Sequence, residues 1–289
     1  MTYRPKTYWT FSIGITWIAL FIVGYFSHTD VPMVSLLPGA LIGLLAPFGT
    51  AMVLIYGTKN RRAAEDFRKR LLNTQSIPGR YWLVILLLMP AVVLLATLTS
   101  LLLGGSADQF KLHPDFLAGG WALFITLIGI MLAPTFEELG WRSYGMESLK
   151  QHRTIFSATM IFAVLWALWH VPLFFIKDYY QQTLIGYGAA HVVNFFVQCL
   201  AAAFLMNWVY YKTGRSIIGI ILFHAMINIT AMILQTEQST KLIVTLLLII
   251  LSAAVYAANR DFFHRSAGSD EDIQGLQQQE QAPGVLTDR

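Results

Sequence analysis

The sequence has little charge and few long polar stretches. Only 12% of its 289 residues are Asp, Glu, Lys or Arg and 56% are hydrophobic, whereas an ordinary soluble domain carries about 25% charged residues. The long polar pieces are residues 58–80 and the tail after Arg265. This composition excludes an ordinary soluble protein and predicts a polytopic membrane protein without a separate soluble domain.

Cysteine and concentrated basic surface are also scarce. Cys199 is the single cysteine and lies in an apolar run, so the chain can form no internal disulfide and no cysteine-based metal cluster. The formal net charge is only +4, and the basic residues are spread over many short segments. We therefore expect no nucleic-acid binding.

Apolar runs long enough to cross a membrane are abundant. A transmembrane helix needs about 20 apolar residues, and we expect spans at 7–26, 38–57, 81–103, 118–136, 155–175, 187–211, 216–235 and 241–258. The expected fold is all-α, with about eight transmembrane helices in a single domain over residues 1–265. Residues 266–289 are rich in Gln, Gly and acidic residues, which predicts a disordered polar tail.

The basic residues predict an orientation. With the N-terminus inside, three of the 20 Lys and Arg residues fall outside, namely Lys111, Lys177 and Lys241. The positive-inside rule therefore places the N- and C-termini in the cytoplasm. The densest cluster, at 59–72, has the pattern of a basic amphipathic helix on the cytoplasmic leaflet, or of a topology determinant that happens to be helical.

Two adjacent glutamates end the fourth run, in the stretch APTFEELGWR. Ionisable side chains within membrane spans are costly and usually functional. Glu138 and Arg142 are four residues apart and can form an ion pair on one helical face. Glu137 points about 100° away and is left free to act as a general base. The alternative is that all three residues form a polar cap at the end of a span.

Histidines in the fifth and seventh runs are the other candidates. His170 follows Trp166 by four residues and precedes Pro172, which indicates a kink. It is either a packing residue or a proton-handling group. His224 and Asn228 share one helical face and can either donate two hydrogen bonds to one point or bridge neighbouring helices.

These three patterns occur in order along the chain, as E-E-x-x-x-R at 137–142, W-x-x-x-H at 166–170 and H-x-x-x-N at 224–228. Together they resemble the motifs of the CAAX protease and bacteriocin-processing family of intramembrane proteases, which includes the type II CAAX prenyl endopeptidases. The resemblance covers residues 118–235. It implies an intramembrane endopeptidase that cleaves near the C-terminus of a prenylated CAAX-type peptide or another membrane-associated peptide.

The resemblance also implies a role for each residue of the motifs. Glu137 would activate a water molecule with the help of His170, and His224 and Asn228 would stabilise the oxyanion. The residues with an implied role are the catalytic Glu137, His170, His224 and Asn228, the supporting Glu138 and Arg142, and the substrate-binding Trp141 and Trp166.

The expected mechanism uses water without a metal, although Glu137, His170 and His224 offer an alternative Glu-His-His set for zinc. The expected partners are a peptide or prenylated protein and the lipid bilayer, and the sequence does not indicate an oligomeric state. We expect the active site to face the cytoplasm. His170 lies about 22 Å of helix from the cytoplasmic start of its own run. Contact between Glu137 and His170 therefore requires the fourth helix to continue past Arg142 toward Leu149, and the fifth helix to start further into the cytoplasm or to tilt strongly.

Two other classes of protein fit the same residues. A non-catalytic membrane immunity or scaffold protein could keep the fold, and a proton-coupled transporter could use the glutamates and histidines as a relay. A transporter more often shows paired repeats with interrupted helices, and no internal repeat is visible in the sequence. The order of the three motifs favours the protease.

Overall fold

The computed structural model describes residues 3–58, 61–117 and 119–266. Within these ranges the chain is helical, with one isolated β-bridge between Leu112 and Leu234 and no strand. The α-helices are α1 (Pro5–Ser27), α2 (Met33–Met52), α3 (Arg61–Leu71), α4 (Gly79–Leu102), α5 (Pro114–Leu117), α6 (Gly120–Gly140), α7 (Met146–Lys150), α8 (Ile155–Trp169), α9 (Tyr180–Gly186), α10 (Ala189–Lys212), α11 (Ile217–Ile233), α12 (Gln238–Ala258) and α13 (Arg260–Phe263). The wider or tighter helical turns are η1 (Val53–Gly57), η2 (Ala107–Phe110), η3 (Trp141–Gly145) and η4 (Val171–Phe175).

The predicted all-α membrane fold is confirmed. Seven of the described helical segments are long and apolar enough to cross a membrane, and the shorter apolar helix α11 coincides with the remaining predicted run. The second span begins at Met33, earlier than the predicted start at residue 38. Pro38 lies inside α2 and not in its first turn. The predicted polar tail lies outside the described residues, apart from residue 266.

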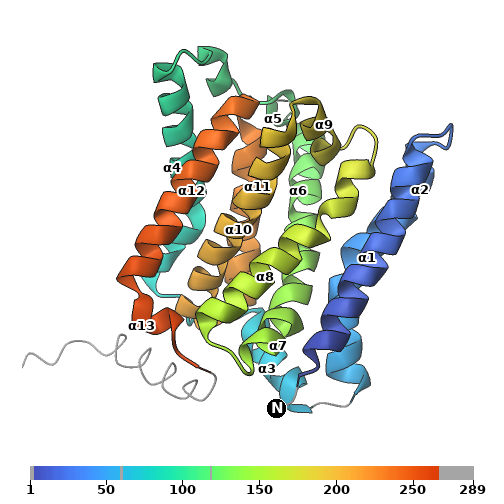
Figure 1. The fold of residues 1–289 in the computed structure, drawn as a ribbon, viewed down its shortest axis with the longest axis vertical. Helices are drawn as coiled ribbons and strands as arrows, with labels where there is room; N and C mark the ends of the chain where they lie inside the picture. Colours follow the sequence, from blue (N-terminus) through green and yellow to red (C-terminus); the bar gives the residue numbers. More distant parts are fainter. Residues whose placement is uncertain (1–2, 59–60, 118, 267–289) are drawn as a thin grey trace, which may run out of the picture.

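The helices form one bundle with α1 and α2 on one flank and α4 and α12 on the other (Figure 1). Helix α2 packs on α6, and α10 packs on both α8 and α12. The start of α1, the amphipathic helix α3, α7 and α13 all lie at the same end of the bundle (Figure 1). The segments that carry most of the basic residues therefore share one end, which we call the terminus end.

The fourth span extends well beyond its apolar run. After α6 the helix continues through η3, a π-helical turn, and through α7 to Lys150, for 31 residues in all. Glu137 is thus about 20 Å of helix from the end at Lys150, and His170 is about 22 Å from the start of α8. The fourth helix thus continues past Arg142, as the predicted contact between Glu137 and His170 requires.

Pro172 has a different effect from the kink that the sequence predicts. Helix α8 ends at Trp169, and the chain continues as the tight turn η4, in which Pro172 occupies the first turn. Proline lacks a backbone N–H and fits best in the first turn of a helical segment. Pro172 therefore ends α8 at Trp169, directly before His170. Pro134, by contrast, lies inside α6.

Packing differs sharply between the two halves of the fourth span. All residues from 141 to 150 are buried, whereas none of residues 121–129 is buried. Glu137 lies between these regions, at the start of the tightly packed half. The helix that follows Glu137 toward the terminus end is therefore packed inside the bundle.

Gly140 allows α2 to approach the glutamates closely. A Cβ atom at this position would lie 2.6 Å from the backbone nitrogen of Phe48 and the carbonyl carbon of Pro47. Gly140→Ala should therefore push α2 away and lower the unfolding free energy by about 1–3 kcal/mol. Gly129→Ala in the same helix meets nothing within 4 Å and is the matched control. Equal thermal midpoints for both variants in detergent would contradict this close approach.

Candidate active site

Glu137 is a buried carboxylate with an indole donor. Its side chain lies in α6 with only 4% of the residue exposed. Trp166 of α8 donates a hydrogen bond from Nε1 to Glu137 Oε2 at 2.9 Å. The first two motifs therefore meet at this bond, which joins residues 29 apart in sequence. Trp141, four residues after Glu137 in the same helical span, is a second indole that interacts with this carboxylate.

Glu138 belongs to a separate, fully paired group. Arg142 Nε lies 2.7 Å from Glu138 Oε2, and both side chains are completely buried, which confirms the predicted ion pair. His224 Nδ1 donates to Glu138 Oε1 at 3.0 Å, because a carboxylate oxygen is an acceptor. The third motif thus joins the first through Glu138, and Nε2 is the nitrogen of His224 left for other partners.

Arg142 is held by more than its ion pair. Its guanidinium donates to Asn207 Oδ1 of α10 and lies over the ring of Phe162, 4.4 Å from the centroid. An Arg guanidinium commonly stacks on aromatic faces in this way. Sequence reasoning missed Asn207, whose signal was a polar residue near the end of the sixth apolar run.

His170 adjoins the same tryptophan. Its Nδ1 lies 2.8 Å from the carbonyl oxygen of Trp166, so Nδ1 must be the donor and Nε2 of the neutral ring is a free acceptor. The indole of Trp166 meets the His170 ring edge-on at 5.2 Å and the His224 ring at 5.5 Å. Trp166 therefore contacts Glu137 and lies against both histidines.

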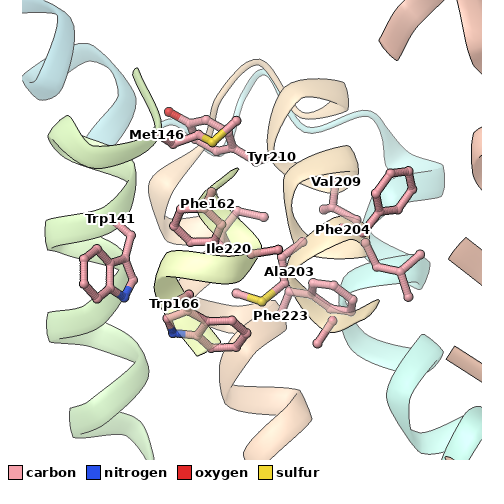
Figure 2. Close-up of a cluster of buried hydrophobic side chains, with 14 of the residues drawn as sticks. Trp141, Met146, Phe162, Trp166, Ala203, Phe204, Val209, Tyr210, Ile220 and Phe223 are labelled. Carbon is pink, nitrogen blue, oxygen red and sulfur yellow. The ribbon is translucent and has the colours of Figure 1, made fainter. Parts of the chain in front are cut away.

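Two predicted site residues make fewer contacts with this group. Asn228 is half-buried, and its side chain makes no hydrogen bond within the described part of the chain. Trp141 is fully buried and stacks on Trp9 of α1 at 5.2 Å, within the cluster that also holds Phe162 and Trp166 (Figure 2). A substrate contact by Trp141 would require this packing to open, and both roles remain predictions.

The alternative zinc site would use the side chains of Glu137, His170 and His224. Across residues 3–58, 61–117 and 119–266, no group of three or more His, Cys, Asp or Glu side chains is arranged to hold a metal ion. His170 and His224 each use Nδ1 for a hydrogen bond, to the Trp166 carbonyl and to Glu138, so their Nε2 atoms are the ones open to other partners. The mechanism without a metal stays a prediction.

Fold and site together define a class of protein. A polytopic all-α bundle carries a glutamate within its spans, next to a second, ion-paired glutamate and two histidines. A potential base and proton-handling groups held together inside membrane helices are the elements of an intramembrane hydrolase.

Comparison with known proteins identifies the family within this class. Residues 119–230 match the family described as type II CAAX prenyl endopeptidase Rce1-like, a range that includes all three motifs. The chain is also 35% identical over 274 residues to CAAX prenyl protease 2 of Methanococcus maripaludis, covering 92% of this chain and 98% of that protein. The chain belongs to the family of type II CAAX prenyl endopeptidases, and it is an integral membrane protease with multiple spans.

The indole N–H of Trp166 should contribute more to the rate of peptide cleavage than its aromatic ring does. Trp166→Phe keeps an aromatic ring against both histidines but removes the donor to Glu137, and a hydrogen bond to a charged group contributes about 1.5–3 kcal/mol. We expect kcat for peptide cleavage to fall by about 10-fold or more. Trp17→Phe is the control, because it removes an indole bond to the Leu168 carbonyl on an exposed face. Equal rates for the two variants would contradict the role of this bond.

Proposed function

We propose that the protein is an intramembrane endopeptidase that hydrolyses a peptide bond near the C-terminus of a prenylated CAAX-type peptide by means of a glutamate-activated water. The observation that carries the proposal is the unequal pairing of the two glutamates. Glu138 is neutralised by Arg142 and held by His224. Glu137 accepts a hydrogen bond from Trp166 at Oε2 and has no arginine or lysine partner among the described residues, and in this proposal its Oε1 binds the water molecule.

In the proposed reaction the water lies between Glu137 and the acceptor nitrogen Nε2 of His170. Glu137 takes a proton as the water oxygen attacks the scissile carbonyl carbon, which gives a tetrahedral intermediate. In this reaction His224 is the imidazolium: it donates through Nδ1 to Glu138 and through Nε2 to the oxyanion. Asn228 donates to the same oxyanion through its amide. Each such donor contributes about 2.7–4 kcal/mol in other hydrolases. Glu137 then returns the proton to the leaving amine as the C–N bond breaks.

The substrate assignment rests on the family and on apolar surface beside the site. The relative from Methanococcus maripaludis is named a CAAX prenyl protease, and at 35% identity over nearly its full length the same substrate class is the natural proposal here. The part of α6 that precedes Glu137 exposes large apolar side chains, including Ile128 and Leu132, which lie about 14 and 8 Å of helix from Glu137. A prenyl chain would find hydrocarbon contacts there within reach of Glu137.

We also propose that the site is reached from the cytoplasmic side of the membrane. The positive-inside rule favours a cytoplasmic terminus end, and at that end the residues of the fourth span, 141–150, are all buried. The peptide would therefore approach along the side of α6. Single-cysteine variants made in a Cys199→Ala chain and labelled from each side of the membrane test this orientation.

The function is tested with purified protein in detergent and a fluorogenic peptide that ends in a farnesylated CaaX sequence. We expect cleavage of this peptide, and at least about 10-fold lower kcat/KM for the same peptide without the farnesyl group. Equal cleavage of both peptides would contradict the prenylated substrate. No cleavage by well-folded protein would contradict the enzyme itself and favour the non-catalytic scaffold.

A further inference from the structure

The π-helical turn η3 follows the two glutamates directly. It spans Trp141–Gly145, and the backbone N–H of Met146 bonds to the carbonyl of Trp141, five residues back. Such turns interrupt the regular α-helical ladder and are frequent at functional sites. The turn is fully buried, so each of its carbonyl groups needs a donor from the protein.

Arg70 of α3 supplies donors for two of these carbonyl groups. Its Nη1 donates to the carbonyl oxygen of Arg142 at 2.7 Å, and its Nη2 donates to the carbonyl oxygen of Ser143 at 3.2 Å. Only 3% of Arg70 is exposed, although it lies in the basic cluster that predicts a membrane-surface helix. A guanidinium presents its donors as a rigid fork, which matches two successive carbonyl groups of one turn.

A buried network holds this arginine in place. Asp66 lies 2.6 Å from Arg70 and 2.8 Å from Arg215. Tyr210 accepts from Arg70 at 2.7 Å and donates to Glu147, which also pairs with Arg215. Burial opposes ionisation of Asp66, but the two arginines outweigh it and hold the pKa of this carboxyl below its usual value. The network therefore stays charged at neutral pH and orients the fork toward η3.

We propose that Arg70 is a positioning residue for the hydrolysis, and that it fixes the rotation of Glu137 and Glu138 by stabilising the π-helical turn. The proposal rests on the function proposed above. An α-helix turns by about 100° per residue, so relaxation of η3 to a regular α turn rotates the glutamates relative to α7. All residues of α7 are buried, whereas none of residues 121–129 of α6 is buried, so the rotation falls on α6 and on the glutamates that it carries.

Steady-state kinetics of Arg70→Met and Arg70→Lys test the role. Methionine keeps an apolar stem but removes all donors, whereas lysine keeps a cation that reaches one carbonyl. We expect kcat to fall by about 10-fold or more in Arg70→Met and by less in Arg70→Lys, with KM within about threefold of wild type. Arg68→Met is the control, because Arg68 is exposed on the same helix and should leave both constants unchanged.

A folded Arg70→Met protein with wild-type kcat overturns the proposal, and so does a loss of activity that only follows the folded fraction. If Arg70→Met does not fold, a folded Arg70→Lys protein with wild-type kcat overturns it instead. Amide hydrogen exchange separates this result from failure of the proposed function. We expect faster exchange in Arg70→Met confined to residues 137–150, which is measurable even if no peptide is cleaved, and unchanged exchange there overturns the proposal.

Discussion

Replacement of Glu137 by glutamine should reduce kcat for peptide cleavage by about 1,000-fold or more and leave the protein folded. A positioned general base contributes about 100-fold to 10,000-fold, and here the same group also returns the proton to the leaving amine. Glutamine has nearly the same shape, and its carbonyl oxygen can still accept from Trp166. The loss should therefore appear in kcat and not in the thermal midpoint.

The control for this variant is Glu65→Gln. Glu65 is exposed on α3, so its replacement removes one carboxylate without touching the spans. We expect wild-type kinetics for Glu65→Gln and equal thermal midpoints for both variants. A Glu137→Gln enzyme that keeps more than about a tenth of the wild-type kcat would show that another group activates the water.

Replacement of Arg142 by methionine should have the largest effect on stability. Arg142 is completely buried, and it pairs with Glu138 and donates to Asn207. Removing one partner of a buried ion pair costs about 3–5 kcal/mol, because the other charge is left without compensation. We expect little folded protein in detergent, a much lower thermal midpoint for the remainder, and loss of cleavage together with the fold.

The double variant Arg142→Met, Glu138→Gln distinguishes this cause from simple loss of packing. With both charges removed, no buried charge remains uncompensated, so we expect part of the lost stability to return. Arg62→Met, which changes an exposed arginine of α3, should leave stability unchanged. An Arg142→Met protein as stable as wild type would contradict the assigned contribution of the pair.

Features that depend on neighbours in sequence could be predicted. The apolar runs predicted the spans because hydrocarbon thickness sets the length of each helix. The pair of Glu138 and Arg142 could be predicted because residues four apart share a helical face. Their spacing did not show that the pair would be fully buried, since burial depends on Phe162 and Asn207, which come from other helices.

Features that depend on contacts between distant segments could not be predicted. The bond from Trp166 to Glu137 joins residues 29 apart, and the bonds from Arg70 to η3 join residues 72 and 73 apart. The burial of Arg70 could not be predicted either, because the basic cluster around it predicts a helix on the membrane surface. The π-helical turn has no residue pattern in the sequence that distinguishes it from the α-helix on either side.

The most direct test of the glutamate mechanism is a parallel measurement on wild-type and Glu137→Gln protein after treatment with a metal chelator. The farnesylated CaaX peptide is the substrate, and the initial cleavage rate is the readout. We expect treated wild-type protein to keep its rate and the treated variant to be about 1,000-fold slower. Loss of wild-type activity with the chelator and its return with added zinc would contradict the account, as would an active Glu137→Gln enzyme.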